Sequence, residues 1–126
     1  MKTKRLFIFL FSWLIIIFNG NKVAAQNDSI MFGRASFYAN KFIGRTTSNG
    51  EIFSQEKLTA AHKTLPFGTY VKVTNLKNRH SVIVKVNDRL PQNSKRTIDL
   101  TRAAAKELHM INSGLAKVSL EIVDGR

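Results

Sequence analysis

Two runs of alternating residues in the second half of the chain constrain the fold most. The run 70–74 and the run 81–87 each place valine at every second position. A period of two puts alternate side chains on one face, so each run predicts a strand with one buried side. The connection 75–79 contains Asn78, which tolerates the left-handed conformation of a tight turn. We therefore expect the two strands to form a hairpin.

The remaining patterns predict further short strands and one helix. The stretch 59–66 has too many small and β-branched residues for a helix. The other expected elements are a frayed leader at Gln26–Met31, a strand at Gly33–Tyr38, a surface loop at Ala39–Glu51, a short strand at Arg96–Leu100, a helix from Arg102 to about His109 with Thr101 as N-cap and Asn112–Gly114 as its stop, and a last strand at Val118–Ile122. Several short strands with one helix favour a small closed or nearly closed barrel.

The N-terminus carries the pattern of a targeting segment. Lys2, Lys4 and Arg5 precede an apolar run at 6–18, which is shorter than the roughly 20 residues that span a bilayer. Small residues at 23–25 suit a signal-peptidase site. We expect residues 1–25 to be a signal peptide and residues 26–126 to be one mature, exported domain without a membrane span. An uncleaved anchor is the alternative.

Net charge and cysteine content limit which binding partners, metal sites and covalent modifications the chain can have. The chain has a net charge of +12, and loss of residues 1–25 leaves 16 basic against 8 acidic residues, or +8. In an exported protein this charge favours anionic polymers of the periplasm or cell envelope over nucleic acid, with simple solubility as the alternative. The absence of cysteine excludes disulfides, thiolate metal ligands and a lipidated N-terminal cysteine. A monomer is expected for so small a domain.

Three residues are candidates for chemistry. Asp88 continues the alternating series of 82–86, which predicts that it points toward the apolar face, where burial would raise its pKa and suit a general acid. Its alternative is to cap the turn at 88–91. His62 can orient a carboxylate or fill a structural role, and Glu51 on the long loop is a solvated charge or a functional one.

Five sequence blocks resemble one known family. They are Gly33-Arg34-Ala35-Ser36-Phe37-Tyr38, Gly44-Arg45-Thr46-Thr47-Ser48-Asn49-Gly50-Glu51, Leu58-Thr59-Ala60-Ala61-His62-Lys63-Thr64-Leu65-Pro66, Val86-Asn87-Asp88-Arg89 and Ile98-Asp99-Leu100-Thr101-Arg102-Ala103-Ala104-Ala105. In this order the blocks resemble the RlpA-like family of lytic transglycosylases. The resemblance implies a mainly β fold, a six-stranded double-psi β-barrel with one short helix and an open groove.

The resemblance also implies an activity. Family members cleave the β-1,4 bond between N-acetylmuramic acid (MurNAc) and N-acetylglucosamine (GlcNAc) in peptidoglycan, with 1,6-anhydroMurNAc as product, and prefer glycan strands stripped of stem peptides. The matching catalytic residues are Asp88, His62 and Glu51, with Asp88 as general acid and then base and the other two orienting it or the sugar. No cofactor is implied. A metal site of these three residues is an alternative that lacks the usual short ligand spacing.

Further residues are expected to bind the glycan. The hydroxyl and amide groups of Thr46, Ser48 and Asn49 can form hydrogen bonds to sugars, and the ring of Tyr38 can offer a stacking face. Asn87, Arg89 and Asp99 are also expected to bind the substrate. Asp99 is also a rival carboxylate, or a helper of the helix cap.

The chain departs from the family pattern in two places. Ala39-Asn40 follow the first tyrosine where a glycine is common, and Leu90 replaces the glycine that usually follows the arginine. A glycine beside Asp88 would permit positive φ or close backbone approach, so Leu90 is expected to alter that turn. The Leu90 change favours the alternative function, a non-catalytic peptidoglycan-binding or wall-loosening barrel of the expansin type, whereas the match at Glu51, His62 and Asp88 favours the enzyme.

Overall fold

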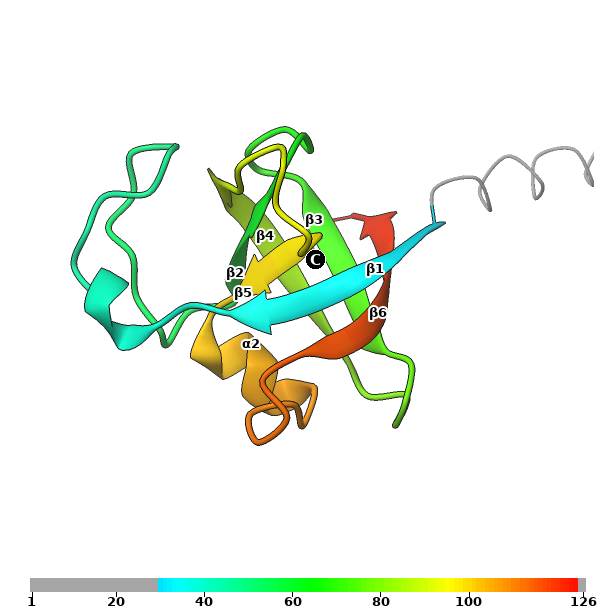
Figure 1. Ribbon diagram of the computed structural model, residues 1–126. Coiled ribbons are helices and arrows are strands. Elements are labelled where there is room, and N and C mark those ends of the chain that lie inside the picture. Colours follow the sequence, from blue (N-terminus) through cyan, green and yellow to red (C-terminus); the bar gives the residue numbers. More distant parts are fainter. Residues whose placement is uncertain (1–29, 125–126) are drawn as a thin grey trace, which may run out of the picture.

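The computed structural model describes residues 30–124 (Figure 1). The predicted signal peptide lies outside these residues. The elements are β1 (Ile30–Phe37), the 3-10 turn η2 (Asn40–Phe42), β2 (Thr59–His62), β3 (Tyr70–Asn75), β4 (Ser81–Arg89), β5 (Ile98–Leu100), α2 (Arg102–Glu107) and β6 (Ala116–Val123). Helices long and apolar enough to cross a membrane are absent from this described part of the chain.

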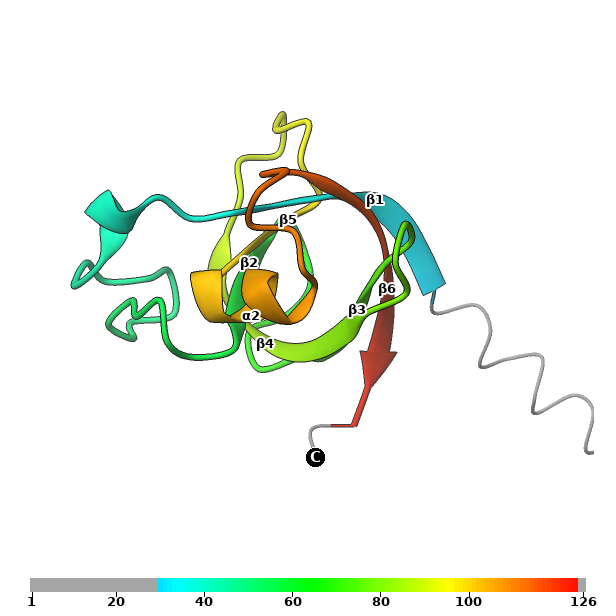
Figure 2. The ribbon, with the colours of Figure 1, turned by 90° about the horizontal axis from the view of Figure 1, so that it is seen from below.

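The six strands close into a barrel in the order β1-β5-β2-β4-β3-β6. Two of the six pairings are parallel, β1 with β5 and β2 with β4, and the other four are antiparallel. Closure gives each of the six strands a paired neighbour on both sides. Helix α2 lies across one end of the barrel, as Figures 1 and 2 both show. This arrangement confirms the predicted six-stranded double-psi barrel with one short helix.

The barrel interior holds the apolar side chains that the alternation predicted. Strands β3 and β4 bury every second residue until β4 nears its end. The largest fully buried apolar side chains are Ile98, Leu100, Leu108, Met110, Leu120, Val71, Val73, Val84, Val86 and Val118. Strand β2 was not predicted, because it lies between β4 and β5 and buries three consecutive residues, so its sequence shows no alternation.

Three local expectations are wrong in detail. Strand β1 begins at Ile30, so the last two residues of the expected leader are already paired with β6. In the β3–β4 turn the positive φ of 69° belongs to Arg79 rather than to Asn78. Helix α2 ends at Glu107, before the expected stop at 112–114, because His109 takes a φ of 53°.

The ends of α2 have clear causes. The side chain of Thr101 accepts a hydrogen bond from the backbone N–H of Ala104 at 3.3 Å, which confirms the predicted N-cap. After the left-handed His109, the N–H of Met110 donates to the carbonyl of Ala105 at 3.2 Å. This is the six-to-one bond of a Schellman motif, and it turns the chain away from the helix.

Candidate functional site

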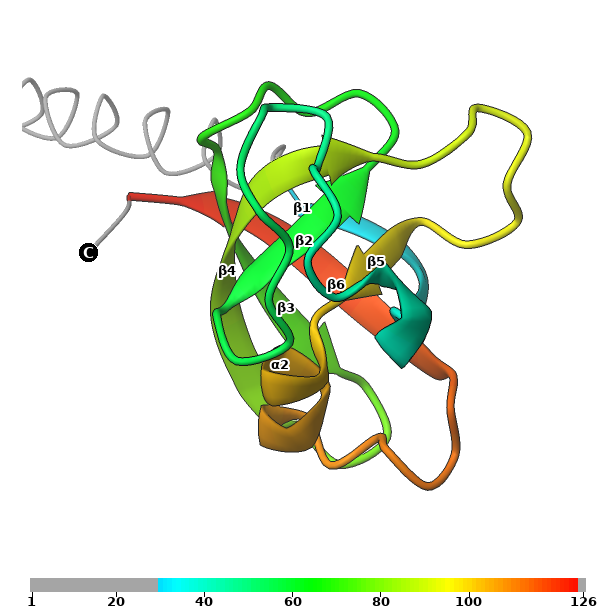
Figure 3. The same cartoon turned by 90° about the vertical axis from the view of Figure 1, so that its left-hand side faces the viewer.

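An open groove of about 840 Å³ lies at the side of the barrel where β1 and β4 end. Figure 3 looks onto this side, where the loop following β1 and the connection from β4 to β5 flank the strand ends. The lining residues are Ser36, Phe37, Tyr38, Ala39, Phe42, Arg45, Thr46, Ala61, Asp88, Arg89, Leu90, Pro91, Arg96 and Asp99. The groove therefore collects five of the predicted site residues: Tyr38, Thr46, Asp88, Arg89 and Asp99.

The strand register places two carboxylates on one row of the groove floor. Ser36 pairs with Asp99, Asp99 pairs with Ala61, and Ala61 pairs with Asp88. Because neighbouring strands lie about 4.8 Å apart, the Cα atoms of the two aspartates are separated by two such spacings. The methyl side chain of Ala61 leaves the space between the carboxylates open.

A bulge in β4 decides where Asp88 points. The register with β2 shifts between Ala60, which pairs with Val86, and Ala61, which pairs with Asp88. Asn87 is therefore the extra residue, and it is 3% exposed. The alternation of β4 stops at Val86, so the prediction that Asp88 faces the barrel core is wrong. The bulge turns Asp88 toward the groove instead.

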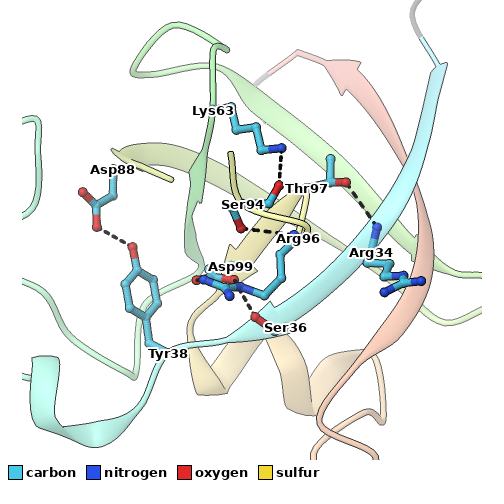
Figure 4. Close-up of polar contacts among 9 residues, drawn as sticks. All are labelled: Arg34, Ser36, Tyr38, Lys63, Asp88, Ser94, Arg96, Thr97 and Asp99. Atoms are coloured by element: carbon cyan, nitrogen blue, oxygen red, sulfur yellow. Dashed lines mark hydrogen bonds and ion pairs between the residues drawn. The ribbon is translucent and has the colours of Figure 1, made fainter. Parts of the chain in front are cut away.

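Four donors surround the Asp88 carboxylate. Tyr38 Oη donates at 2.5 Å (Figure 4), Ser48 donates through its backbone N–H at 2.9 Å and its Oγ at 2.7 Å, and the N–H of Arg89 donates at 2.9 Å. Partial burial acts to raise the pKa of Asp88, but these hydrogen bonds outweigh it and hold the pKa below its ordinary value. The predicted raised pKa is thus wrong for the ligand-free protein.

The second carboxylate forms a separate network (Figure 4). Asp99 accepts from Ser36 Oγ at 2.5 Å and from Arg96 Nε at 2.7 Å and Nη2 at 3.1 Å. The hydrogen bond that Arg96 donates to Asp99 raises the pKa of Arg96. Asp99 is only 8% exposed. It does not cap α2, since the capping oxygen belongs to Thr101.

Further hydrogen bonds, made by residues outside the groove, hold the loop that carries Ser48 in place. Asn49 Oδ1 accepts from Thr47 Oγ1 at 2.7 Å and from the N–H of Glu51 at 3.1 Å. Asn87 Nδ2 donates to Glu51 Oε1 at 2.9 Å, and this bond, followed by one from Asn49, lowers the pKa of Glu51. Asn49, Glu51 and Asn87 do not line the groove, and the carboxylate of Glu51 is exposed.

His62 is 5% exposed and does not line the groove. Its Nδ1 accepts hydrogen bonds from the backbone N–H groups of Thr64 and Leu65, each at 3.1 Å. Burial, and then the charges of Arg89 and Lys63, lower its pKa. A neutral imidazole that accepts at Nδ1 carries its proton on Nε2. The carbonyl of His62 accepts from Arg89 Nη1 at 3.4 Å, so the residue also supports the arginine beside Asp88.

Leu90 fits its position without backbone strain. Within residues 30–124, the non-glycine residues with positive φ are Arg79 and His109, so the Leu90 backbone lies outside the left-handed region. Its N–H donates to the carbonyl of His62 at 3.3 Å, and its side chain is 6% exposed at the groove wall. The Leu90 backbone is thus unstrained, and the expected difference of this turn from that of a glycine-bearing family member stays a prediction.

Among the lining residues that were missed in the sequence, four carry hydroxyl, aromatic or guanidinium groups: Ser36, Phe42, Arg45 and Arg96. Arg96 stands three residues before Asp99, a spacing that could have indicated the ion pair. Ser36 and Arg45 lie inside the recognised sequence blocks but carried no assigned role. Among residues 30–124, no three His, Asp or Glu side chains group closely enough to hold a metal ion.

Fold and site together define a small double-psi β-barrel protein with two carboxylates across an open groove. The family model described as lytic transglycolase matches residues 30–120. The chain belongs to this family and is RlpA-like. A probable endolytic peptidoglycan transglycosylase RlpA of Treponema pallidum is 53% identical over 110 residues, which cover 86% of this chain and 35% of that protein.

Other relatives and structures agree with this assignment. The endolytic peptidoglycan transglycosylase RlpA of Neisseria meningitidis serogroup A is 53% identical over 111 residues, covering 85% of this chain and 46% of that protein. The chain thus spans less than half the length of these curated relatives. An expansin of Clavibacter michiganensis superposes with a TM-score of 0.62 at 22% identity over 77% of this chain and 52% of that one. A Streptomyces papain inhibitor superposes with a TM-score of 0.61 at 22% identity, covering 75% of this chain and 94% of the inhibitor. These two structures share the fold.

Proposed function

We propose that this chain is an exported endolytic peptidoglycan lytic transglycosylase that cleaves the MurNAc-GlcNAc β-1,4 bond and forms 1,6-anhydroMurNAc. The observation that carries the proposal is the presentation of Asp88 on the groove floor by Tyr38, Ser48 and Arg89. Identity of 53% to proteins named for this activity supports it. The preferred substrate is a glycan strand without stem peptides, and the chain acts in the periplasm or cell envelope.

Asp88 serves as acid and then as base. In the free protein its lowered pKa keeps it ionised at neutral pH. A sugar ring over the groove floor removes water, and sugar hydroxyls compete for Ser48 Oγ, so both changes raise the pKa and favour uptake of a proton. The protonated carboxyl then gives this proton to the glycosidic oxygen as the bond from C1 breaks.

The remaining steps need no external water. The C6 hydroxyl of the same MurNAc attacks C1, and its proton passes to the Asp88 carboxylate, which restores the acid. Attack within one ring gives the proximity that an activated water would otherwise need. Asp99, on the same row of the floor and ion-paired with Arg96, is the second carboxylate near the oxocarbenium-like transition state.

His62 and Glu51 act in this proposal as positioning residues. The backbone carbonyl of His62 accepts hydrogen bonds from the guanidinium of Arg89 and from the N–H of Leu90. Glu51 holds the loop of Ser48 against β4 through Asn87. Tyr38, Thr46, Ser48 and Arg89 face or border the groove, where they bind the glycan.

The test uses intact and peptide-stripped peptidoglycan incubated with the full chain. Mass spectrometry of the products should show 1,6-anhydro muramyl ends, more from stripped strands, and Asp88→Asn should abolish them. Asp124→Asn, an exposed aspartate outside the groove, is the matched control and should cleave normally. A product with a reducing MurNAc end instead of the anhydro form would refute the transglycosylase mechanism.

A non-catalytic glycan-binding barrel is the second candidate, and one observation favours it. The four hydrogen bonds to Asp88 stabilise its ionised form, which cannot donate a proton. Saturable sedimentation with peptidoglycan without anhydro products would establish this function.

Export is tested separately. Mass analysis of the protein recovered from the envelope of expressing cells should give a mature chain that begins at Gln26. An intact N-terminus in the membrane fraction would show an anchor instead.

A further inference from the structure

Three arginines line the groove, and two of them are already engaged. Arg96 forms an ion pair with Asp99, with 2.7 Å between Nε and Oδ1. The guanidinium of Arg89 lies 4.1 Å from the ring centroid of Phe67, a cation–π contact. These contacts fix the direction of both guanidinium groups.

Arg45 differs because hydrogen bonds hold its backbone, whereas its guanidinium has only a longer contact with an aromatic ring. Its N–H donates to the carbonyl of Phe42 at 3.1 Å, and its own carbonyl accepts from the N–H of Phe53 at 2.7 Å. The guanidinium lies 5.8 Å from the Phe42 ring centroid. Within residues 30–124, the ion pair of Arg96 with Asp99 is the one found, so Arg45 has no carboxylate partner there. Arg89 also lacks a carboxylate partner there, but its Nη1 donates to the carbonyls of His62 and Asp88 at 3.4 Å each. Among the groove arginines of residues 30–124, Arg45 is therefore the one whose guanidinium has neither an ion pair nor a hydrogen bond.

The groove also presents an anion that would repel an anionic ligand. Asp88 is ionised in the free protein, and its hydrogen-bond donors are neutral groups. A negatively charged strand can settle over this carboxylate only if a cation in the same groove offsets the repulsion. Arg45 meets that requirement, since a guanidinium can donate two parallel hydrogen bonds to a carboxylate.

The glycan itself offers one anionic group, the lactyl carboxylate on MurNAc. In intact peptidoglycan this carboxyl is consumed in the amide bond to the stem peptide, and removal of the peptide restores its charge. The carboxylate then recurs on every second sugar, so a strand that occupies the groove brings one near Arg45.

We infer that Arg45 binds the free lactyl carboxylate of MurNAc and thereby selects peptide-stripped strands. The inference rests on the proposed peptidoglycan substrate. It adds that the Arg45 guanidinium distinguishes strands without stem peptides from strands that carry them. Arg45 is a specificity residue for binding and takes no part in proton transfer.

The experiment measures binding of one glycan in two charge states. Peptide-stripped strands are compared with the same strands after their lactyl carboxylates have been converted to neutral amides. The full chain carries Asp88→Asn, so that strands are not cleaved, and binding is followed by co-sedimentation. In this background we compare Arg45→Gln, Arg45→Lys and, as matched control, Arg34→Gln, which changes an exposed arginine of β1 outside the groove.

Without a change at Arg45 the protein should bind the carboxylate strands about fivefold more tightly than the amidated ones, as suits one partly exposed ion pair. Arg45→Gln should abolish this preference and leave binding to amidated strands unchanged, which also shows that the variant is folded. Arg45→Lys should keep part of the preference, and Arg34→Gln all of it. The preference should shrink at high salt.

A preference that persists in Arg45→Gln would overturn the inference. The outcome is independent of cleavage, which is measured with Asp88 intact. Absence of anhydro products together with an Arg45-dependent preference would refute the proposed activity and leave the carboxylate contact standing. Normal anhydro products together with a preference that does not depend on Arg45 would support the proposed activity and refute the carboxylate contact.

Discussion

The contact between Tyr38 and Asp88 gives the most direct test of how the groove controls its acid. Tyr38→Phe removes the hydroxyl that donates to Asp88 Oδ2 at 2.5 Å. It keeps the ring, which lies 4.3 Å from Phe53 and 5.8 Å from Phe42 between centroids. The tyrosine stays neutral because burial and the neighbouring carboxylate raise its pKa. The substitution therefore changes one hydrogen bond and little packing.

The magnitude follows from that hydrogen bond. A bond to a charged acceptor is worth about 1.5–3 kcal/mol, and one pKa unit corresponds to about 1.4 kcal/mol. Asp88 is partly exposed and keeps three other hydrogen bonds. After a reduction for solvent screening, loss of the tyrosine bond should raise the pKa of Asp88 by about one unit. The sign is upward because the bond stabilises the ionised form.

The assay is the pH dependence of kcat/KM for anhydro product formation. Activity that requires protonated Asp88 falls as pH rises through its pKa, and this limb should move up by about one unit in Tyr38→Phe. Tyr70→Phe on β3, outside the groove, should leave the limb unchanged. An unshifted limb in Tyr38→Phe would refute the view that Tyr38 holds the pKa of Asp88 down.

Three further predictions concern stability. In Gly33→Ala the new Cβ would lie 2.0 Å from Thr97 Oγ1, so thermal unfolding should show a loss of about 1–3 kcal/mol, and an unchanged melting temperature would contradict this close approach. Thr101→Val should cost about 1–3 kcal/mol in urea unfolding, because it removes both the α2 cap and the bond to the Lys57 carbonyl, whereas Thr101→Ser should cost less. His62 has a lowered pKa in the folded state, so stability should decline as pH falls from about 6.5 toward that value, and His62→Gln should flatten this decline if the histidine causes it.

The sequence allowed the barrel to be predicted where one face of a strand meets the core. The alternation at 70–74 and 81–86 matched β3 and β4, and the cap at Thr101 was found because its signal is local. Strand β2 was missed because burial on both faces removes the alternation. Parallel pairing of β2 with β4 joins distant segments, which no local pattern reveals.

The site was predicted less completely because its geometry depends on one extra residue. The alternation of residues 82–86 predicted that Asp88 faces the core. The bulge at Asn87 instead moves the later residues of β4 to the opposite face of the strand. The environment of Asp88 then follows from side chains 40 and 50 positions away, Ser48 and Tyr38. The raised pKa expected from burial alone was wrong for this reason.

The closed pairing order also bears on when this chain can fold. Strand β1, the first strand within residues 30–124, pairs with β5 and β6, so its partners lie in residues 98–100 and 116–123. Such distant pairings make folding slow, because a long stretch of chain must be ordered before the contacts form. The barrel cannot close until nearly the whole domain has emerged from the ribosome. For the export proposed above, that delay would keep the polypeptide unfolded, and so able to pass through a secretion channel, until its last strand has been synthesised.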